Sequence, residues 1–189
     1  MDTIVATALW RRLDTEGHDA CRLIRKADGW RLSGCATFDH KGSLCLLSYT
    51  VDCDAGWRTR SANVTGSVGL GPLVFDVESI PGGRWLLNGE EQPEARGCID
   101  LDLGFTPATN LLAIRRLDPK PGIEVPAPAA YYLEFTLALG VIAQTYRRTA
   151  GNTLHYRSPA YGYDETLTVS DVGFVTDYPG LWSGKVVTA

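Results

Sequence analysis

The stretch Gly97–Leu117 reads GCIDLDLGFTPATNLLAIRRL, and the rest of the chain is organised around it. Its first part alternates apolar residues with carboxylates, a period of two that predicts a strand with one apolar face. The alternating residues are Ile99, Asp100, Leu101, Asp102 and Leu103. The other face of this predicted strand therefore carries two acidic side chains.

A turn and a second apolar run follow in the same stretch. Gly104 and Pro107 end the strand, and Thr109 and Asn110 are residue types that hydrogen-bond their own backbone in turns. The apolar run at 111–114 then leads into two adjacent arginines, and we expect this segment to be extended as well. Two carboxylates, a turn amide and two guanidinium groups thus gather within a short stretch.

Arg115 and Arg116 are the candidate cationic groups of this stretch. Adjacent residues of a strand point to opposite faces, so we expect at most one of them to face an internal cavity. A guanidinium there would hold a carboxylate or phosphate through two hydrogen bonds. The alternative is that one arginine pairs internally with Asp100 or Asp102 and that the other is solvated.

Asp100 and Asp102 share one strand face and lie about 6.6 Å apart at the usual rise per residue. Two carboxylates at this separation can do acid–base chemistry or hold a hard cation. The structural alternative is that they balance the charges of the nearby arginines. The Asp-x-Asp spacing is weakly specific, because Asp52 and Asp54 repeat it.

Further candidate binding residues lie outside the central stretch. Trp57 and Arg60 belong to an alternating segment in which an aromatic platform adjoins hydrogen-bonding groups, an arrangement that suits sugar rings. The alternative places Trp57 in the core and leaves the arginines of this segment in solvent. Gln144, Tyr146 and Tyr178 would add polar contacts in the same cavity, although tyrosines also bridge core and surface.

The chain resembles the bacterial family known as putative glycolipid-binding proteins. The run D-x-D-x-x-x-x-P-x-T-N-x-L-x-I-R-R-L from Asp100 to Leu117 carries the resemblance. Other matching residues follow in order: Tyr49, Asp54, Trp57, Arg60, Gln144, Tyr146, Asp171, Gly173, Tyr178 and Trp182. The likeness covers residues 10–182, and it implies an architecture similar to the periplasmic lipoprotein-carrier proteins, with a strongly curved antiparallel sheet around an apolar cavity.

Composition and turn spacing favour the same class of fold. The 189 residues include 20 Gly and 10 Pro, which suits a chain with many turns, and a single domain spanning 1–189 is expected. Segments of β character recur at the spacing typical of an all-β barrel or sandwich. We therefore predict a mainly all-β protein, a curved antiparallel sheet or barrel around an apolar cavity, with few short helices.

Three segments depart from the regular pattern of short strands and turns. Asp118–Pro128 contains four prolines and is expected to be a rigid extended loop. Tyr131–Arg148 has the length of a helix, but its β-branched and aromatic residues favour two strands broken near Gly140. The glycines at 66, 69 and 71 are expected to form a loop.

Charge and cysteine usage indicate the compartment and the class of partner. A net charge of −4 gives no basic footprint for nucleic acid. No apolar run is long enough for a membrane helix, and the N-terminus lacks the order of a signal peptide, so we expect a cytoplasmic protein. Five cysteines without a C-x-x-C pair are expected to be reduced thiols.

Sequence motifs for established chemistries are missing. The three histidines lie far apart and lack the spacing of zinc ligands, so neither a metal nor another cofactor is expected. The chain has no G-x-S-x-G elbow, and its glycine-rich segment lacks the ending of a phosphate-binding loop. No complete catalytic constellation is visible in the sequence.

Three hypotheses about function follow. The first is binding of an amphipathic ligand, a glycolipid or lipid-like molecule, with apolar strand faces around its tail and Arg60, Asp102, Asn110 and Arg115 around its head. The second is an enzyme of glycolipid or carbohydrate metabolism that uses Asp100 or Asp102 as acid or base. The third is a structural module. A cavity above about 300 Å³ that contains Asp102 favours the first two, and a filled interior favours the third.

Overall fold

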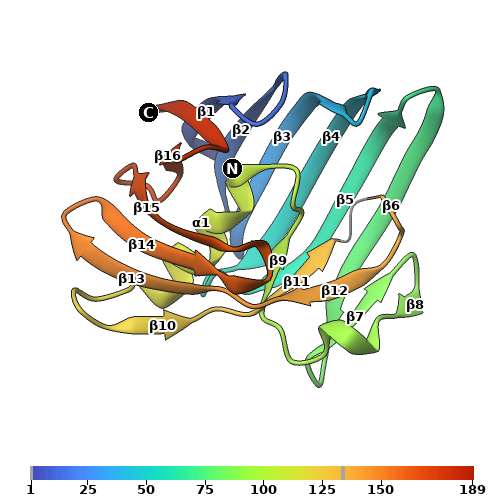
Figure 1. The fold of residues 1–189 in the computed structure, drawn as a ribbon. Coiled ribbons are helices and arrows are strands. Elements are labelled where there is room, and N and C mark those ends of the chain that lie inside the picture. Colours follow the sequence, from blue (N-terminus) through green and yellow to red (C-terminus); the bar gives the residue numbers. More distant parts are fainter. Residues whose placement is uncertain (1, 133–134) are drawn as a thin grey trace.

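The computed structural model describes residues 2–132 and 135–189, and β-strands dominate it (Figure 1). The main sheet contains fourteen strands in the order β10-β13-β14-β15-β16-β17-β1-β2-β3-β4-β5-β6-β7-β8. Its first seven strands along the chain are β1 Thr3–Arg12, β2 Gly17–Lys26, β3 Gly29–His40, β4 Ser43–Asp54, β5 Thr59–Val68, β6 Gly71–Ile80 and β7 Arg84–Leu87. The others are β8 Glu90–Glu91, β10 Glu124–Pro126, β13 Thr145–Ala150, β14 Thr153–Ser158, β15 Tyr163–Val169, β16 Val175–Tyr178 and β17 Trp182–Thr188.

A smaller sheet of three strands lies inside the fold, in the order β12-β11-β9. Its strands are β9 Asp100–Asp102, β11 Ala129–Tyr132 and β12 Leu139–Ile142. The helical elements are short: α1 Asn110–Leu117 and the 3-10 turns η1 Pro93–Ala95, η2 Pro107–Thr109 and η3 Pro159–Tyr161. The predicted all-β class with few short helices is therefore confirmed.

The main sheet is open, with β10 and β8 at its two edges. Its two halves meet where β1 pairs with β17 in antiparallel register, from Ala6 opposite Thr188 to Arg12 opposite Trp182. We call β1–β6 the N-terminal wing and β10, β13, β14 and β15 the C-terminal wing. The curved antiparallel sheet is confirmed, and the alternative of a closed barrel is wrong because the two edge strands do not pair.

Turn chemistry explains why the N-terminal wing is a regular meander. Lys41 and Gly42 join β3 to β4, and both have positive φ, +53° and +83°. Two such residues form the type I′ turn that matches the twist of a two-stranded hairpin. The side chain of Asp39 accepts a hydrogen bond from the Gly42 backbone N–H at 2.7 Å, which further fixes this turn.

The central stretch behaves partly as predicted. Residues 100–102 form strand β9, but residues 111–114 belong to helix α1 and the extended conformation expected there is wrong. The Thr106 hydroxyl accepts a hydrogen bond from the Ala108 backbone N–H at 3.0 Å and so opens the helical segment. Successive residues of a helix are about 100° apart, so Arg115 and Arg116 do not point to opposite faces as strand neighbours would.

Other segments show smaller differences from the sequence prediction. Tyr131–Arg148 is extended in β11, β12 and β13, but Gly140 lies inside β12 rather than at a break; residues 133–134 are outside the described residues. The proline-rich segment contains the edge strand β10, which pairs with β13. The loop expected at glycines 66, 69 and 71 is confined to a tight turn, since β5 runs to Val68 and β6 starts at Gly71.

Helix α1 and the small sheet lie between the two wings, where they contribute to the main core (Figure 1). Three residues of the small sheet, Ala129, Tyr131 and Ile142, form a separate apolar cluster. Two buried indoles tie the parts together. Trp10 donates its Nε1–H to the carbonyl of Val175 at 2.6 Å, and Trp85 donates to the carbonyl of Cys98 at 3.1 Å. Gly184 gives Trp10 its space, because a Cβ there would lie 2.2 Å from the indole ring.

None of the helices in the described residues is long and apolar enough to cross a membrane.

All five cysteines are unpaired: Cys35 is exposed, and Cys21, Cys45, Cys53 and Cys98 are buried. Burial raises the pKa of Cys53 to about 12 and that of Cys98 to about 11, which suppresses their reactive thiolate forms. We expect a thiol reagent to modify one cysteine quickly in the folded protein and all five after denaturation without reductant. Cys35→Ser should remove the fast reaction, and fewer than five thiols in denaturant would contradict the absence of disulfides.

Candidate functional site

A cavity of about 310 Å³ lies between the central stretch and the C-terminal wing. Aromatic residues are the most numerous kind in its walls, which also contain one carboxylate. The lining residues are Asp102, Gly104, Thr106, Pro107, Asn110, Tyr131, Ile142, Tyr156, Ser158, Tyr161, Tyr163, Tyr178, Leu181 and Trp182. This volume lies at the lower end of the range of small-molecule sites.

Asp102 brings the charge into this cavity from the end of β9. Its Oδ1 accepts a hydrogen bond from the Gly104 backbone N–H at 2.8 Å and a longer one from the Thr109 hydroxyl at 3.5 Å. Burial raises the pKa of Asp102 to about 6, and these two hydrogen bonds oppose the rise. The second oxygen, Oδ2, accepts no hydrogen bond from the described residues and remains available to a bound molecule.

A chain of hydrogen bonds supports the cavity wall from behind. Asn110 at the start of α1 donates its amide Nδ2–H to the Tyr146 hydroxyl at 2.8 Å. The amide oxygen of Gln144 accepts a hydrogen bond from Tyr156 at 2.8 Å and a longer one from Tyr146 at 3.5 Å. Tyr146 is fully buried and does not line the cavity, so its part is to hold Asn110 in place.

The tyrosines of the cavity wall pack edge to face. Tyr178 lies 5.7 Å from Tyr156 and 5.1 Å from Tyr163, measured between ring centroids, with interplanar angles of 77° and 67°. The Tyr163 hydroxyl donates a hydrogen bond to the carbonyl of Pro179 at 2.8 Å. Tyr131 and Tyr161 form another edge-to-face pair at 5.8 Å. Contacts of this kind fix the orientation of each ring.

Ser158 contributes a hydroxyl group to the cavity wall. The residue lines the cavity and is 2% exposed, and its hydroxyl has no hydrogen-bond partner of ordinary geometry among the described residues. Buried hydroxyl groups are normally paired, so an unpaired one next to a cavity is consistent with a partner supplied by a bound molecule.

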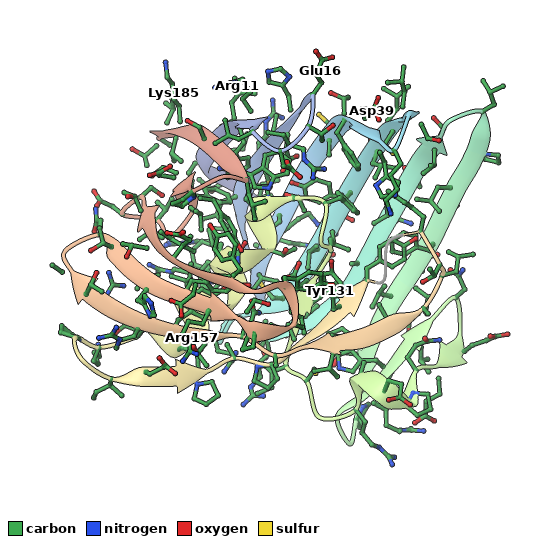
Figure 2. The ribbon with its side chains drawn as sticks, in the orientation of Figure 1. Arg11, Glu16, Asp39, Tyr131, Arg157 and Lys185 are labelled. Atoms are coloured by element: carbon green, nitrogen blue, oxygen red, sulfur yellow. The ribbon has the colours of Figure 1, made fainter. Side chains whose placement is uncertain are left out.

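The view with side chains shows the contrast between the interior and the surface (Figure 2). Tyr131 lies among the side chains between the wings, whereas Arg11 and Lys185 extend outward at the top of the view. Arg157 is exposed as well. None of the described residues that line the cavity is Lys, Arg or His. The guanidinium groups expected around a bound head group therefore lie elsewhere.

Arg116 is bound to Asp100 instead of facing the cavity. Its Nε and Nη2 donate to the two carboxylate oxygens at 2.9 and 2.5 Å. The side chain of Asp100 is 2% exposed and that of Arg116 is 15% exposed. The two residues form a bidentate ion pair, the geometry that best compensates the charge of a buried carboxylate. This ion pair also connects α1 to β9. The structure thus contains the alternative in which one arginine pairs internally with Asp100 or Asp102.

Arg115 lies on another side of α1. Its guanidinium carbon is 5.1 Å from the centroid of the Trp57 ring. The indole of Trp57 is buried and stacks on Trp30 at 4.5 Å with an interplanar angle of 14°. Trp57 precedes β5 in a left-handed conformation with φ of +66°, so it is not on a strand face, and its burial places it in the core. Arg115 also borders a separate pocket of about 360 Å³ next to Arg148 and Asp171.

Arg60 lies on the exterior, where its Nη1 donates to Asp28 at 2.6 Å. The structure thus brings together Asp102, Asn110 and Tyr178 at the cavity, with Gln144 and Tyr146 behind them. It separates Trp57, Arg60, Asp100, Arg115 and Arg116 from the cavity.

Most aromatic residues of the cavity wall were not among the predicted site residues: Tyr131, Tyr156, Tyr161, Tyr163 and Trp182. Strand register holds the signal that would have found several of them. Tyr146 is directly opposite Tyr156 in the β13–β14 pair, and Tyr178 is opposite Trp182 in the β16–β17 pair. Residues opposite each other in adjacent strands share a face, so each predicted tyrosine indicates an aromatic neighbour.

A second buried carboxylate lies behind the cavity, where it anchors the central stretch to the N-terminal wing. Asp19 accepts hydrogen bonds from the hydroxyls of Tyr49, at 2.9 Å, and Thr106. Gly34 leaves room for this arrangement, because a Cβ there would lie 2.4 Å from the Tyr49 ring. Burial raises the pKa of Asp19 to about 7. Thr106 links this carboxylate to the cavity, since it also lines the wall.

The fold and the cavity define an all-β protein in which one long open sheet wraps a short helix and an aromatic cavity. Residues 7–184 match the family described as "Putative glycolipid-binding", and the chain belongs to this family. Among solved structures it is similar to a DUF1089 family protein from Pseudomonas aeruginosa, with 27% sequence identity and a TM-score of 0.77 over 87% of this chain and 90% of that one. No curated protein matches the chain.

Proposed function

We propose that this protein binds an amphipathic ligand, a glycolipid or lipid-like molecule, with the polar head in the aromatic cavity. The observation that carries the proposal is the cavity of about 310 Å³ with Asp102 in its wall. The family description points to the same class of ligand. We further propose that the chain works as one domain in a reducing, cytoplasmic compartment, which is consistent with five unpaired cysteines.

The chemistry of the walls suits a head group with both polar and apolar faces. Tyrosine and tryptophan rings pack against C–H groups, and Asp102 and Asn110 offer hydrogen-bonding atoms at the same place. Ile142 and Leu181 line the cavity too and would contact the first carbons of a tail. The arginines proposed from sequence as head-group ligands take no part in this arrangement.

A catalytic role remains the second candidate because of Asp102 alone. A carboxylate with a pKa of about 6 in a cavity is able to exchange a proton near neutral pH. The mechanism with two carboxylates lacks support, since Asp100 is bound by Arg116 and does not line the cavity. Binding without reaction is therefore the function that the geometry supports best.

Native mass spectrometry of protein purified without detergent tests binding directly, and a variant of Tyr161 locates the site. Tyr161 lines the cavity and is 59% exposed, so Tyr161→Ala should leave the unfolding midpoint nearly unchanged. It should weaken a bound ligand by about 1–2 kcal/mol, or about five- to thirtyfold, because the ligand loses apolar contact area.

The control for this experiment is Leu44→Ala, which truncates a side chain that is 66% exposed in β4 and does not line the cavity. It should change neither stability nor affinity. Equal affinity of the Tyr161→Ala and Leu44→Ala proteins would place the ligand outside this cavity.

A further inference from the structure

The cavity contains a carboxylate whose charge has no cationic partner. Asp100 has Arg116, Asp28 has Arg60, and Asp52 has Arg31. Asp102 has only a backbone N–H and a hydroxyl, and the described residues that line its cavity include no Lys, Arg or His. Asp102 is partly buried at the end of β9, and a carboxylate that is partly removed from water is stabilised by an opposite charge nearby.

The surrounding aromatic rings favour the same sign of charge. Tyr131, Tyr156, Tyr161, Tyr163, Tyr178 and Trp182 share the cavity with Asp102. The faces of aromatic rings carry partial negative charge and attract organic cations. Asn110 donates one amide N–H to Tyr146, and its amide oxygen is an acceptor in a residue that lines the cavity. The two acceptors, the Asp102 carboxylate and the Asn110 amide oxygen, thus suit a donor or a cation.

An anionic head group meets the opposite conditions. A phosphate, sulfate or carboxylate in the cavity would lie near the unpaired charge of Asp102, with no guanidinium or ammonium group of the wall to bind it. Arg116 of the central stretch does not line the cavity, and its Nε and Nη2 donate to Asp100. Negatively charged ligands are therefore disfavoured by this cavity.

We propose that the head group bound in this cavity carries a cationic nitrogen, as in an amino sugar or another organic ammonium group. This inference rests on the proposed function and makes it more specific. The ammonium group would bind Oδ2 of Asp102, and the tyrosine rings would surround the carbons next to the nitrogen. The Ser158 hydroxyl, which has no hydrogen-bond partner of ordinary geometry among the described residues, would hydrogen-bond another polar group of the same head.

Four alkyl glycosides with one tail length test the proposal: octyl glucoside, octyl glucosaminide, octyl N-acetylglucosaminide and octyl glucuronide, each below its micelle concentration. Calorimetric titration of the wild-type protein at neutral pH should show the glucosaminide binding about ten- to a hundredfold more tightly than the N-acetylated form. The glucuronide should bind most weakly. The Asp102→Asn variant should bind the glucosaminide and the N-acetylated form with about equal affinity.

The control variant is Glu78→Gln, which removes a negative charge on an exposed position of β6 that does not line the cavity. It should keep the wild-type preference. If the four glycosides bind the wild-type protein with equal affinity, the proposed cationic head group is wrong while the proposed binding function stands. If none of the four binds, the proposed function itself fails. The comparison of ligands on the wild-type protein decides the matter even if Asp102→Asn does not fold.

Discussion

Arg116→Ala should destabilise the folded protein by about 3–5 kcal/mol, because it leaves the carboxylate of Asp100 buried without a partner. Both oxygens of Asp100 accept from Arg116, at 2.9 and 2.5 Å, and the carboxylate is 2% exposed. A loss of this size is a large part of the stability of an average domain. Denaturant unfolding followed by circular dichroism would measure it as a lower midpoint with an unchanged slope.

Arg115→Ala is the matched control, since it removes the same side chain from the next position of the same helix. Arg115 is exposed and contacts the ring of Trp57, a cation–π contact worth about 0.5–1 kcal/mol at an exposed site. The double variant Arg116→Ala with Asp100→Asn should recover part of the loss, because it no longer buries a charge. Equal midpoints for the two single arginine variants would show that the Asp100 pair does not stabilise the fold.

The sequence predicted the parts of this fold that depend on local pattern. The regular recurrence of β segments between turn residues predicted the all-β class, and the meander of the N-terminal wing agrees with it. The central strand at 100–102 was found in the same way. In each case the signal and the structure involve residues within a few positions of one another, so no knowledge of distant contacts was needed.

Prediction failed where the outcome depends on distant contacts. The four apolar residues at 111–114 are too few to separate a strand from a helix, and the helix is fixed by Thr106 before it and by packing between two wings. The aromatic cavity draws on residues from 102 to 182, which come together only through strand register. The two carboxylates of Asp-x-Asp illustrate the limit. Their spacing shows that they are close, but only the structure assigns one to Arg116 and the other to the cavity.

Asp19→Asn should change how stability depends on pH, and the effect should reach about 4 kcal/mol. Burial raises the pKa of Asp19 to about 7, compared with 3.8 for an unperturbed carboxyl group. The folded state thus binds this proton more tightly than the unfolded chain does. The stabilising contribution of the protonated group is fully present below pH 3.8 and is lost as the pH rises to about 7. A difference of about three pKa units corresponds to about 4 kcal/mol.

The measurement is the free energy of unfolding of the wild-type and Asp19→Asn proteins at a series of pH values between 4 and 8. An amide keeps the size of the side chain and still reaches the hydroxyls of Tyr49 and Thr106, which can reorient to meet it. The two proteins should differ little at pH 4, and the variant should gain stability relative to the wild type as the pH rises. Other titrating groups, including Asp102, are common to both proteins and cancel in the difference. Parallel curves would mean that Asp19 titrates in the folded state as it does in the unfolded chain, and that its burial between Tyr49 and Thr106 has no energetic consequence for this fold.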